Sequence, residues 1–118
     1  MKKQSFGKNE RVRKRKDYLR AYQEGVRISS VNFAVILNNN GTETRRLGVT
    51  VTKKVGNAVK RNRIKRLVRE FFRLNKDKLP DSHDIIVIAR RDVSSLKYQD
   101  VCVELEKLFR QRYYTCKG

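Results

Sequence analysis

The sequence contains few of the residues that build metal sites, disulfides and redox centres. Its 118 residues include two cysteines, one histidine, one proline and no tryptophan. Cys102 and Cys116 form neither a Cys-x-x-Cys pair nor a cysteine–histidine cluster, so the spacing of a structural zinc site is absent. A lone pair of cysteines in a chain expected to be cytosolic gives little reason to predict a disulfide. Cys102 is expected instead to fill a core position.

Groups for acid–base or metal-assisted catalysis are equally scarce. His83 lies with Asp81 and Asp84 in a short segment after Pro80, where a polar turn ahead of a strand is the commoner explanation. A nuclease that acts alone needs a general base or clustered carboxylates that hold metal ions. The glycines at positions 41, 48 and 56 are isolated, so a phosphate-binding glycine loop is also missing. We predict that the protein alone has no catalytic residues and binds no metal ion or cofactor.

Long apolar runs are missing as well. No run approaches the roughly 18 apolar residues that a membrane-spanning helix needs. The N-terminal residues MKKQSFGKNE also lack the apolar segment of a secretory signal. We therefore expect a cytoplasmic protein that has no membrane partner and no obligate protein partner.

Acidic residues are greatly outnumbered by basic ones. Thirty lysines and arginines stand against twelve aspartates and glutamates, which leaves a formal net charge of +18. Such a chain repels itself unless a polyanion neutralises it. Nucleic acid is the simplest polyanion that fits, and the sequence therefore favours an RNA- or DNA-binding protein.

The length allows one hydrophobic core and leaves no room for a second unit that folds alone. We predict a single RNA-binding domain over residues 1–118. Within it, residues 1–13 are basic and lack periodicity, so the first ten or so are expected to be mobile without a partner, and residues 114–118 form a loose tail.

Hydrophobic periodicity predicts an α+β sandwich. The expected helices cover about 14–24, 57–73 and 98–112, and the expected strands cover 26–29, 33–38, 46–53 and 85–90. The Asn40-Gly41 pair is typical of a hairpin between the second and third strands. In the third strand, Leu47, Val49 and Val51 alternate with Gly48, Thr50 and Thr52, which predicts one apolar face and one small, polar face.

The helix over 57–73 combines an apolar stripe with an unusual concentration of positive charge. Ile64, Leu67, Val68 and Phe71 follow helical spacing and are expected to pack on the apolar face of the sheet. Between Lys60 and Arg73 lie seven basic residues, with Glu70 as the only acid (Lys60, Arg61, Arg63, Lys65, Arg66, Arg69, Arg73). Arginine grips phosphate oxygens through two nitrogens at once, so this face is expected to meet RNA.

The segment from Lys53 to Glu70, KKVGNAVKRNRIKRLVRE, resembles the RNR signature of bacterial ribonuclease P proteins. Agreement extends to Asp17-Tyr18, to Tyr22 ahead of a glycine and to Ile88-Ala89-Arg90. The resemblance implies the order α-β-β-β-α-β-α, with a four-stranded sheet and a ribosomal S5 domain 2-like sandwich. It also implies a left-handed β-α-β crossover, against the strong right-handed norm.

The resemblance further implies a protein subunit of ribonuclease P, whose RNA subunit cleaves with Mg²⁺ to mature the 5′ ends of tRNAs. The protein is implied to bind that RNA and the single-stranded 5′ leader of precursor tRNA. Residues matching the signature should meet the RNA, with neighbouring basic residues close by (Arg61, Asn62, Lys65, Arg66, Arg69; Arg63, Lys53, Lys54, Asn57). The leader should lie in a cleft between the first helix and the sheet (Tyr18, Tyr22, Ala34, Ile36, Thr50, Thr52, Arg90).

Three other classes compete with this interpretation. A small basic ribosomal protein has the same composition and is the strongest alternative. A DNA-binding protein would need more base-reading side chains than Asn62 on the basic helix. A membrane-surface helix would need an apolar stripe that no sheet covers. For Tyr18 and Tyr22, ordinary packing of the first helix is the competing explanation.

Overall fold

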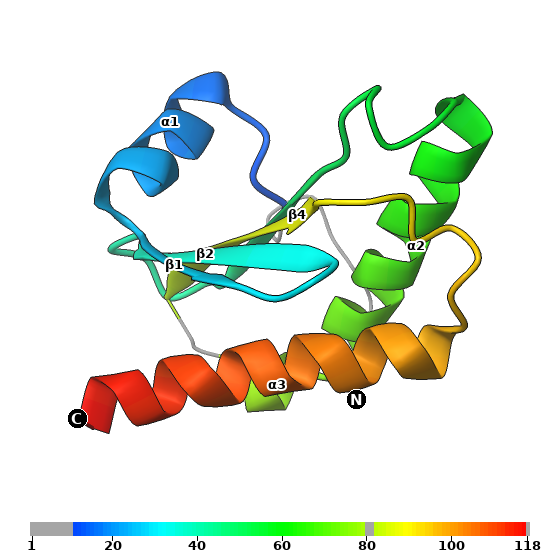
Figure 1. Ribbon diagram of the computed structural model, residues 1–118. Coiled ribbons are helices and arrows are strands. Elements are labelled where there is room, and N and C mark those ends of the chain that lie inside the picture. Colours follow the sequence, from blue (N-terminus) through cyan, green and yellow to red (C-terminus); the bar gives the residue numbers. More distant parts are fainter. Residues whose placement is uncertain (1–10, 80–81, 118) are drawn as a thin grey trace, which may run out of the picture.

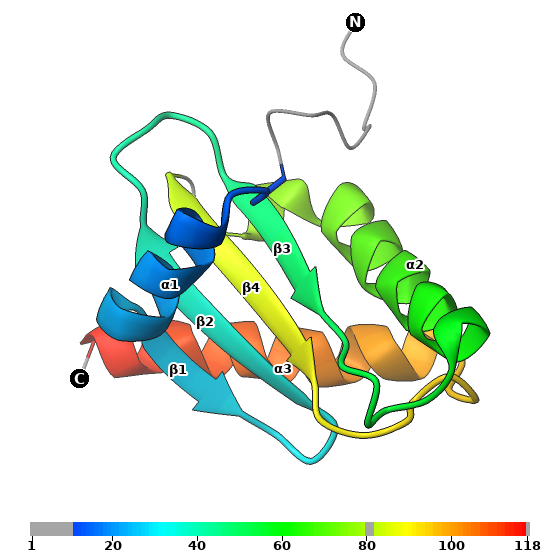
Figure 2. The ribbon, with the colours of Figure 1, turned by 90° about the horizontal axis from the view of Figure 1, so that it is seen from above.

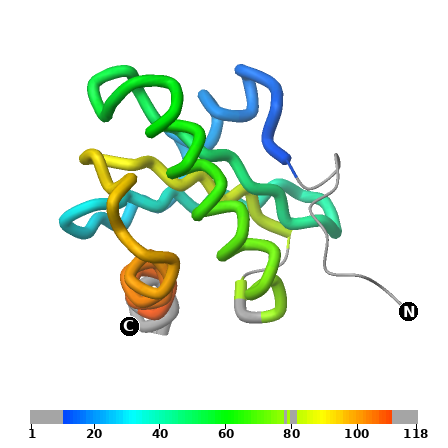
Figure 3. Tube along the Cα trace, turned by 90° about the vertical axis from the view of Figure 1, so that its right-hand side faces the viewer, coloured from blue at the N-terminus to red at the C-terminus, as the bar shows by residue number. Residues whose placement is uncertain are grey.

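The computed structural model describes residues 11–79 and 82–117, in which helices and strands follow the predicted order. The elements are α1 (Arg15–Glu24), β1 (Val26–Ser29), β2 (Phe33–Asn39), β3 (Arg46–Thr50), α2 (Ala58–Leu74), a 3₁₀ turn (Lys76–Lys78), β4 (His83–Ala89) and α3 (Tyr98–Lys117). Helix α1 lies on one side of the sheet and α3 on the other, and α2 runs alongside the sheet and ends beside α3 (Figure 1). Figure 3 views α3 nearly along its axis and shows it on the side opposite α1.

The sheet has the order β1-β2-β4-β3, so the predicted hairpin between β2 and β3 is wrong. Strand β4 lies between them, antiparallel to β2 and parallel to β3. Gly41 does adopt a positive φ of 70°, but the loop that contains it passes the start of β4, where the Asn40 amide donates to the Ser82 carbonyl. The apolar run of β4 is almost entirely buried, and its central position gives it a paired strand on each side, as is typical of a strand covered on both faces.

The connection from β3 through α2 to β4 is left-handed, as the resemblance implies (Figure 2). In that view β3 and β4 run in the same direction and α2 lies beside β3, while Figure 1 shows that α2 ends below the sheet, on the side of α3. The chain therefore moves left when the crossover is seen from the helix side with the strands pointing up. The crossover brings α2 beside β3, the edge strand of the sheet. The basic helix and the sheet edge therefore border the same region.

The larger core lies between the sheet and helices α2 and α3, as the apolar faces predict. Leu47 and Val51 pack there against the α2 stripe, in which Ile64, Val68 and Phe71 are buried. Helix α3 adds Val101, Leu105 and Leu108, and the Phe109 ring stacks on Phe71 with ring centroids 6.1 Å apart. Cys102 is partly buried against this core, as predicted. A smaller cluster of Ala21, Ile36 and Ile86 seats α1 on the opposite face.

Both chain ends differ from the sequence prediction. Val12 is buried, and its amide donates to the Leu47 carbonyl at 2.9 Å, so residues 11–13 run along the free edge of β3. The predicted mobile residues before Arg11 lie outside the described residues. Helix α3 continues to Lys117, beyond the predicted end near Arg112, so most of the expected loose tail is helical.

Candidate RNA interface

The exposed face of α2 carries the residues that match the RNR signature. Ile64, Val68 and Phe71 turn inward, which leaves the opposite face of the helix in solvent. Asn62, Arg63, Arg66 and Arg69 are exposed, whereas Arg61 and Lys65 are half-buried at its margins. Because only one carboxylate, Glu70, lies on this helix, the face is strongly positive.

A tight turn and a helix cap fix the start of this face. The Val55 amide donates to the Thr52 carbonyl, and the buried Val55 side chain anchors a turn that holds Lys53 and Lys54 in solvent. The Asn57 side chain accepts a hydrogen bond from the Lys60 amide at 3.0 Å, which caps α2. Asn57, predicted as an RNA contact, therefore also has a structural role.

Several basic side chains of α2 already have partners in the protein. Arg63 donates to the Ser94 carbonyl, and Lys60 pairs with Asp92 at 3.0 Å. Hydrogen bonds from Ser94, together with Lys60, lower the pKa of Asp92 to about 2. Near the end of the helix Arg73 pairs with Glu70 and lowers the pKa of that carboxyl group. These contacts fix the ends of α2 and hold the loop at 92–94 beside it.

Arg61 presents a donor without an acceptor. Its Nε atom is buried and has no hydrogen-bond partner among the described residues. A buried N–H group without a partner is costly, so an incoming acceptor such as a phosphate oxygen would stabilise it.

Tyr18 and Tyr22 lie on α1 with their rings toward β3. The Tyr18 ring lies against Gly48, where an added Cβ would be 2.7 Å from the Tyr18 hydroxyl oxygen. Burial raises the pKa of Tyr18, and Tyr22 adds to the shift. Tyr22 is 44% exposed, and its hydroxyl lies 3.4 Å from the Thr50 hydroxyl. Tyr18 is therefore partly a packing residue, whereas Tyr22 offers an accessible ring.

The predicted floor of the cleft is only partly accessible. Ala34 and Ile36 are buried, Ile36 beneath α1 against Ala21. Thr50 is half-buried and Thr52 is exposed. Ile88, half-buried and paired in register with both Ala34 and Thr50, belongs to the same face and was missed. Strand alternation would have found it, because it lies two residues after Ile86.

Arg90, the last residue predicted for the cleft, is exposed at the end of β4. Its guanidinium donates to the Ser30 carbonyl, and its backbone amide donates to the Asn32 carbonyl. Arg90 therefore holds the β1–β2 turn and lies beside the accessible part of the face.

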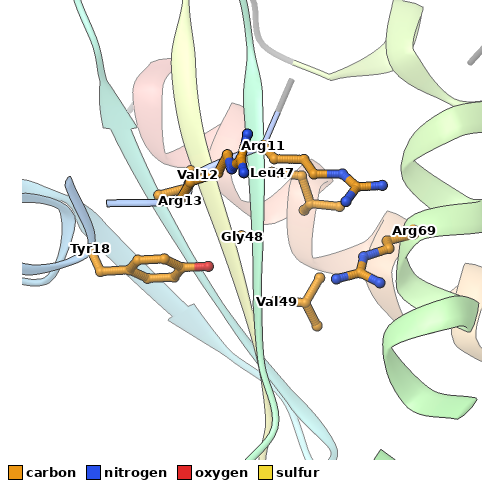
Figure 4. A pocket seen from close by; sticks show the side chains of 8 residues that line it. All are labelled: Arg11, Val12, Arg13, Tyr18, Leu47, Gly48, Val49 and Arg69. Carbon is orange, nitrogen blue, oxygen red and sulfur yellow. The ribbon is translucent and has the colours of Figure 1, made fainter. Parts of the chain in front are cut away.

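A pocket of about 290 Å³ joins the two predicted sites. It opens between α1, β3, α2 and the N-terminal segment (Figure 4). Its lining includes Tyr18, predicted for the leader cleft, and Arg69, predicted for the contact with the catalytic RNA. The other lining residues were not predicted for either site (Arg11, Val12, Arg13, Leu47, Gly48, Val49). Arg11 and Arg13 were missed because the segment has no periodicity from which its position could be inferred.

The described residues contain no group of histidine, cysteine, aspartate or glutamate side chains arranged to hold a metal ion. Over the same part of the chain, none of the helices has the length and apolar character required to cross a bilayer.

Comparison with known proteins gives one consistent result. The family model described as Ribonuclease P matches residues 6–113. The ribonuclease P protein component of Syntrophus aciditrophicus is 57% identical, over 89% of this chain and 88% of the relative. That of Thermotoga maritima is 43% identical, over 77% and 78%. Among solved structures, the RNase P protein of Staphylococcus aureus matches with a TM-score of 0.79 and 36% identity, over 87% and 94%. That of Thermotoga maritima gives 0.78 and 38%, over 86% and 96%.

Proposed function

The chain belongs to the ribonuclease P protein family, and on this premise we propose that the exposed face of α2 binds the catalytic RNA while the α1 face of the sheet holds the precursor's 5′ leader. As a ribonuclease P protein it is a component of a ribonuclease that processes tRNA, and its partner is ribonuclease P RNA. This family membership excludes the ribosomal alternative.

The observation that carries the proposal is the one-sided charge of α2. Its inner face packs in the core, whereas Arg66 and Arg69 are exposed and lie outside the larger apolar cluster. Phosphate contacts supply most of the affinity and orientation of nucleic-acid complexes. Asn62, exposed among the arginines, is suited to a base edge or a 2′-hydroxyl.

We assign the leader to the part of the α1 face that side chains leave open. Tyr22 offers a ring on which an unpaired base can stack, and Thr50 and Thr52 offer hydroxyl groups beside it. Arg90 supplies positive charge at the end of β4. A single strand fits this surface better than a duplex does, because stacking needs bases that are not already paired.

Catalysis is assigned to the RNA subunit with Mg²⁺. The sequence has one histidine and twelve carboxylates against thirty basic residues, which suits a protein that neutralises RNA better than one that coordinates metal ions. The protein alone is therefore expected to be inert. A cytoplasmic location follows, because precursor tRNA is made and matured there.

The test is cleavage of precursor tRNA by a bacterial ribonuclease P RNA at low Mg²⁺, with and without the protein. Wild type should stimulate cleavage, and Arg66→Ala with Arg69→Ala should not. The matched control is Lys107→Ala with Arg110→Ala, which removes the same charge from exposed positions of α3. If the control variant also lost stimulation, the effect would come from overall charge and not from the face of α2. Cleavage by the protein without RNA would contradict the assignment of catalysis to the RNA.

A further inference from the structure

The loop that joins β4 to α3 contains one carboxylate among basic residues. Asp92 follows Arg90 and Arg91 and is the only acid in residues 90–97. This loop runs past the start of α2 before it reaches α3 (Figure 2). The Asp92 carboxylate faces that helix, with the Lys60 Nζ atom 3.0 Å from its Oδ2 atom. On charge alone, a carboxylate at this place would repel an RNA that approaches α2.

Inside the protein, Asp92 fixes the backbone of its own loop. Its Oδ1 atom accepts hydrogen bonds from the Ser94 amide at 3.0 Å and from the Ser94 hydroxyl at 2.6 Å. A side chain that accepts from the amide two residues later forms an Asx turn, which sets the local backbone conformation. Val93, between them, is buried in the larger core, and its carbonyl accepts from the Leu96 amide at 3.0 Å. The Ser94 carbonyl therefore has a fixed place beside α2.

That carbonyl determines how the guanidinium of Arg63 is oriented. The Arg63 Nε atom donates to the Ser94 carbonyl oxygen. A guanidinium is planar and rigid, so a hydrogen bond at Nε also fixes the direction of the two terminal nitrogens. Those nitrogens make no hydrogen bond within the described part of the chain, and the residue is exposed. Both remain available as paired donors to one phosphate group.

The second oxygen of the Asp92 carboxylate contacts α2 directly. It pairs with Lys60 in the first turn of the helix. The Lys60 side chain passes over Gly56, where an added Cβ would lie 2.9 Å from the Lys60 Cδ atom. Asp92 is thus joined to α2 by two routes, one through Lys60 and one through Ser94 and Arg63. An experiment can separate the two routes, because each uses a different carboxylate oxygen.

We propose that Asp92 is a positioning residue for the contact between α2 and ribonuclease P RNA: it holds the Ser94 carbonyl, which in turn holds Arg63 with its terminal nitrogens toward the RNA. The inference rests on the proposed function, because it takes the exposed face of α2 as the RNA-binding surface. A side chain held in one orientation before binding loses less entropy when the RNA arrives. Asp92 acts through Arg63 and does not itself contact the RNA.

The first experiment compares two variants that remove the same charge. Asp92→Ala and Asp92→Asn both abolish the ion pair with Lys60, but asparagine keeps an oxygen that can accept from Ser94. The affinity of the full chain for ribonuclease P RNA should fall about 3- to 10-fold in Asp92→Ala. Asp92→Asn should bind at least as tightly as wild type. An equal rise in both variants would reduce the effect to charge, an equal fall would assign it to Lys60, and either result would overturn the proposal.

The second experiment tests whether the effect of Asp92 passes through Arg63. The Asp92→Ala change is repeated in a chain that also carries Arg63→Ala. In that background it should cause no further loss of affinity, because the side chain that the loop orients is already gone. The same 3- to 10-fold loss in both backgrounds would contradict the route through Arg63.

The third experiment needs no RNA. In NMR spectra of the free protein, the Arg63 Nε–H signal should have the same position and slow solvent exchange in wild type and Asp92→Asn. In Asp92→Ala it should shift and exchange faster, while the signal of Arg66, exposed on the same helix, stays unchanged. An unchanged Arg63 signal in Asp92→Ala would overturn the proposal. If wild type failed to bind RNA, the proposed function would fail, and this signal would still show whether Asp92 holds Arg63.

Discussion

At the scale of single residues, Glu104 shows how one carboxylate holds two distant elements together. From α3 it accepts hydrogen bonds from the Asn32 amide and the Asn32 side chain, both at 2.9 Å, and from the Ser30 hydroxyl. Burial raises the pKa of Glu104, but these hydrogen bonds outweigh it and leave the pKa below its usual value. The ionised group thus fastens the β1–β2 turn to α3.

Glu104→Gln is expected to lower the free energy of unfolding by about 2 kcal/mol at neutral pH, since hydrogen bonds to a charged group are lost. A lowered folded-state pKa stabilises the protein above the unfolded pKa of about 4.3, and this contribution disappears as pH falls through the folded pKa. The difference between wild type and variant should therefore vanish in acid. Urea unfolding at several pH values measures it, with Glu106→Gln as the control, because Glu106 pairs with Arg110 at the longer distance of 3.6 Å.

Asp84 is a second carboxylate on which neighbouring elements depend. Its side chain is 4% exposed, and Arg46 donates to both of its oxygens at 2.7 Å. Asn40 adds a hydrogen bond at 3.0 Å from the loop that precedes β3. The pair therefore joins β3 to β4 at the end where the sheet meets that loop.

Arg46→Ala should destabilise the protein by about 3 kcal/mol, because it leaves a buried carboxylate without its cation. Asp84→Asn in the same chain should recover part of that loss, since no buried charge then remains. Thermal unfolding of the two single variants and the double variant measures the coupling. Additive effects would show that the two side chains do not act as a pair.

At the scale of elements, the packing of α1 on β3 depends on the absence of a side chain at Gly48. An added Cβ would lie 2.7 Å from the Tyr18 hydroxyl oxygen, so the ring or the helix would have to move. Both predicted cleft residues on α1 would then shift, because the Tyr18 and Tyr22 rings lie only 6.4 Å apart.

Gly48→Ala is expected to lower both the free energy of unfolding and the affinity for precursor tRNA. Adding Tyr18→Ala to the same chain should restore part of each loss. The reason is that the second change removes the clashing ring. Unfolding curves and precursor binding by the holoenzyme measure the two effects. If the losses measured for the two single variants simply added up in the double variant, the contact between Tyr18 and Gly48 would not be the cause.

The elements also show what sequence patterns can and cannot predict. The stripe from Ile64 to Phe71 is a local pattern, and it correctly placed α2 on the apolar face of the sheet. The pairing of β2 with β4 is not local, and the Asn40-Gly41 turn favoured the wrong neighbour for β2. Turn chemistry fixes the shape of a loop, whereas the strand order depends on pairing between segments far apart in the sequence.

The same distinction applies to the candidate site. The residues of the basic helix could be predicted, because helical spacing alone places Arg66 and Arg69 opposite the core. Arg11 and Arg13 could not be predicted, since their position depends on the backbone hydrogen bond from Val12 to Leu47. The buried state of Ala34 and Ile36 likewise depends on where α1 lies over the sheet, which no strand pattern contains.

At the scale of the whole molecule, the net charge of +18 dominates the expected interaction with RNA. Each phosphate that the protein neutralises releases counterions, so affinity falls as salt rises, by roughly 0.7 log units per contact and decade of salt for single strands and 0.9 for duplexes. The arginines of α2 and of the pocket lie on one connected region, bordered by β3. Several contacts should therefore form together and give a steep salt dependence.

The last prediction concerns which surface causes that salt dependence, the exposed face of α2 or the exposed side of α3. Replacing Arg66 by alanine should reduce the slope for ribonuclease P RNA by about 1, as expected for the loss of one phosphate contact. Replacing Lys107, exposed on α3, should leave the slope unchanged although the net charge falls equally. Binding measured at several salt concentrations decides the matter. Equal reductions in both variants would mean that RNA responds to total charge, and a flat response in wild type would contradict the interface altogether.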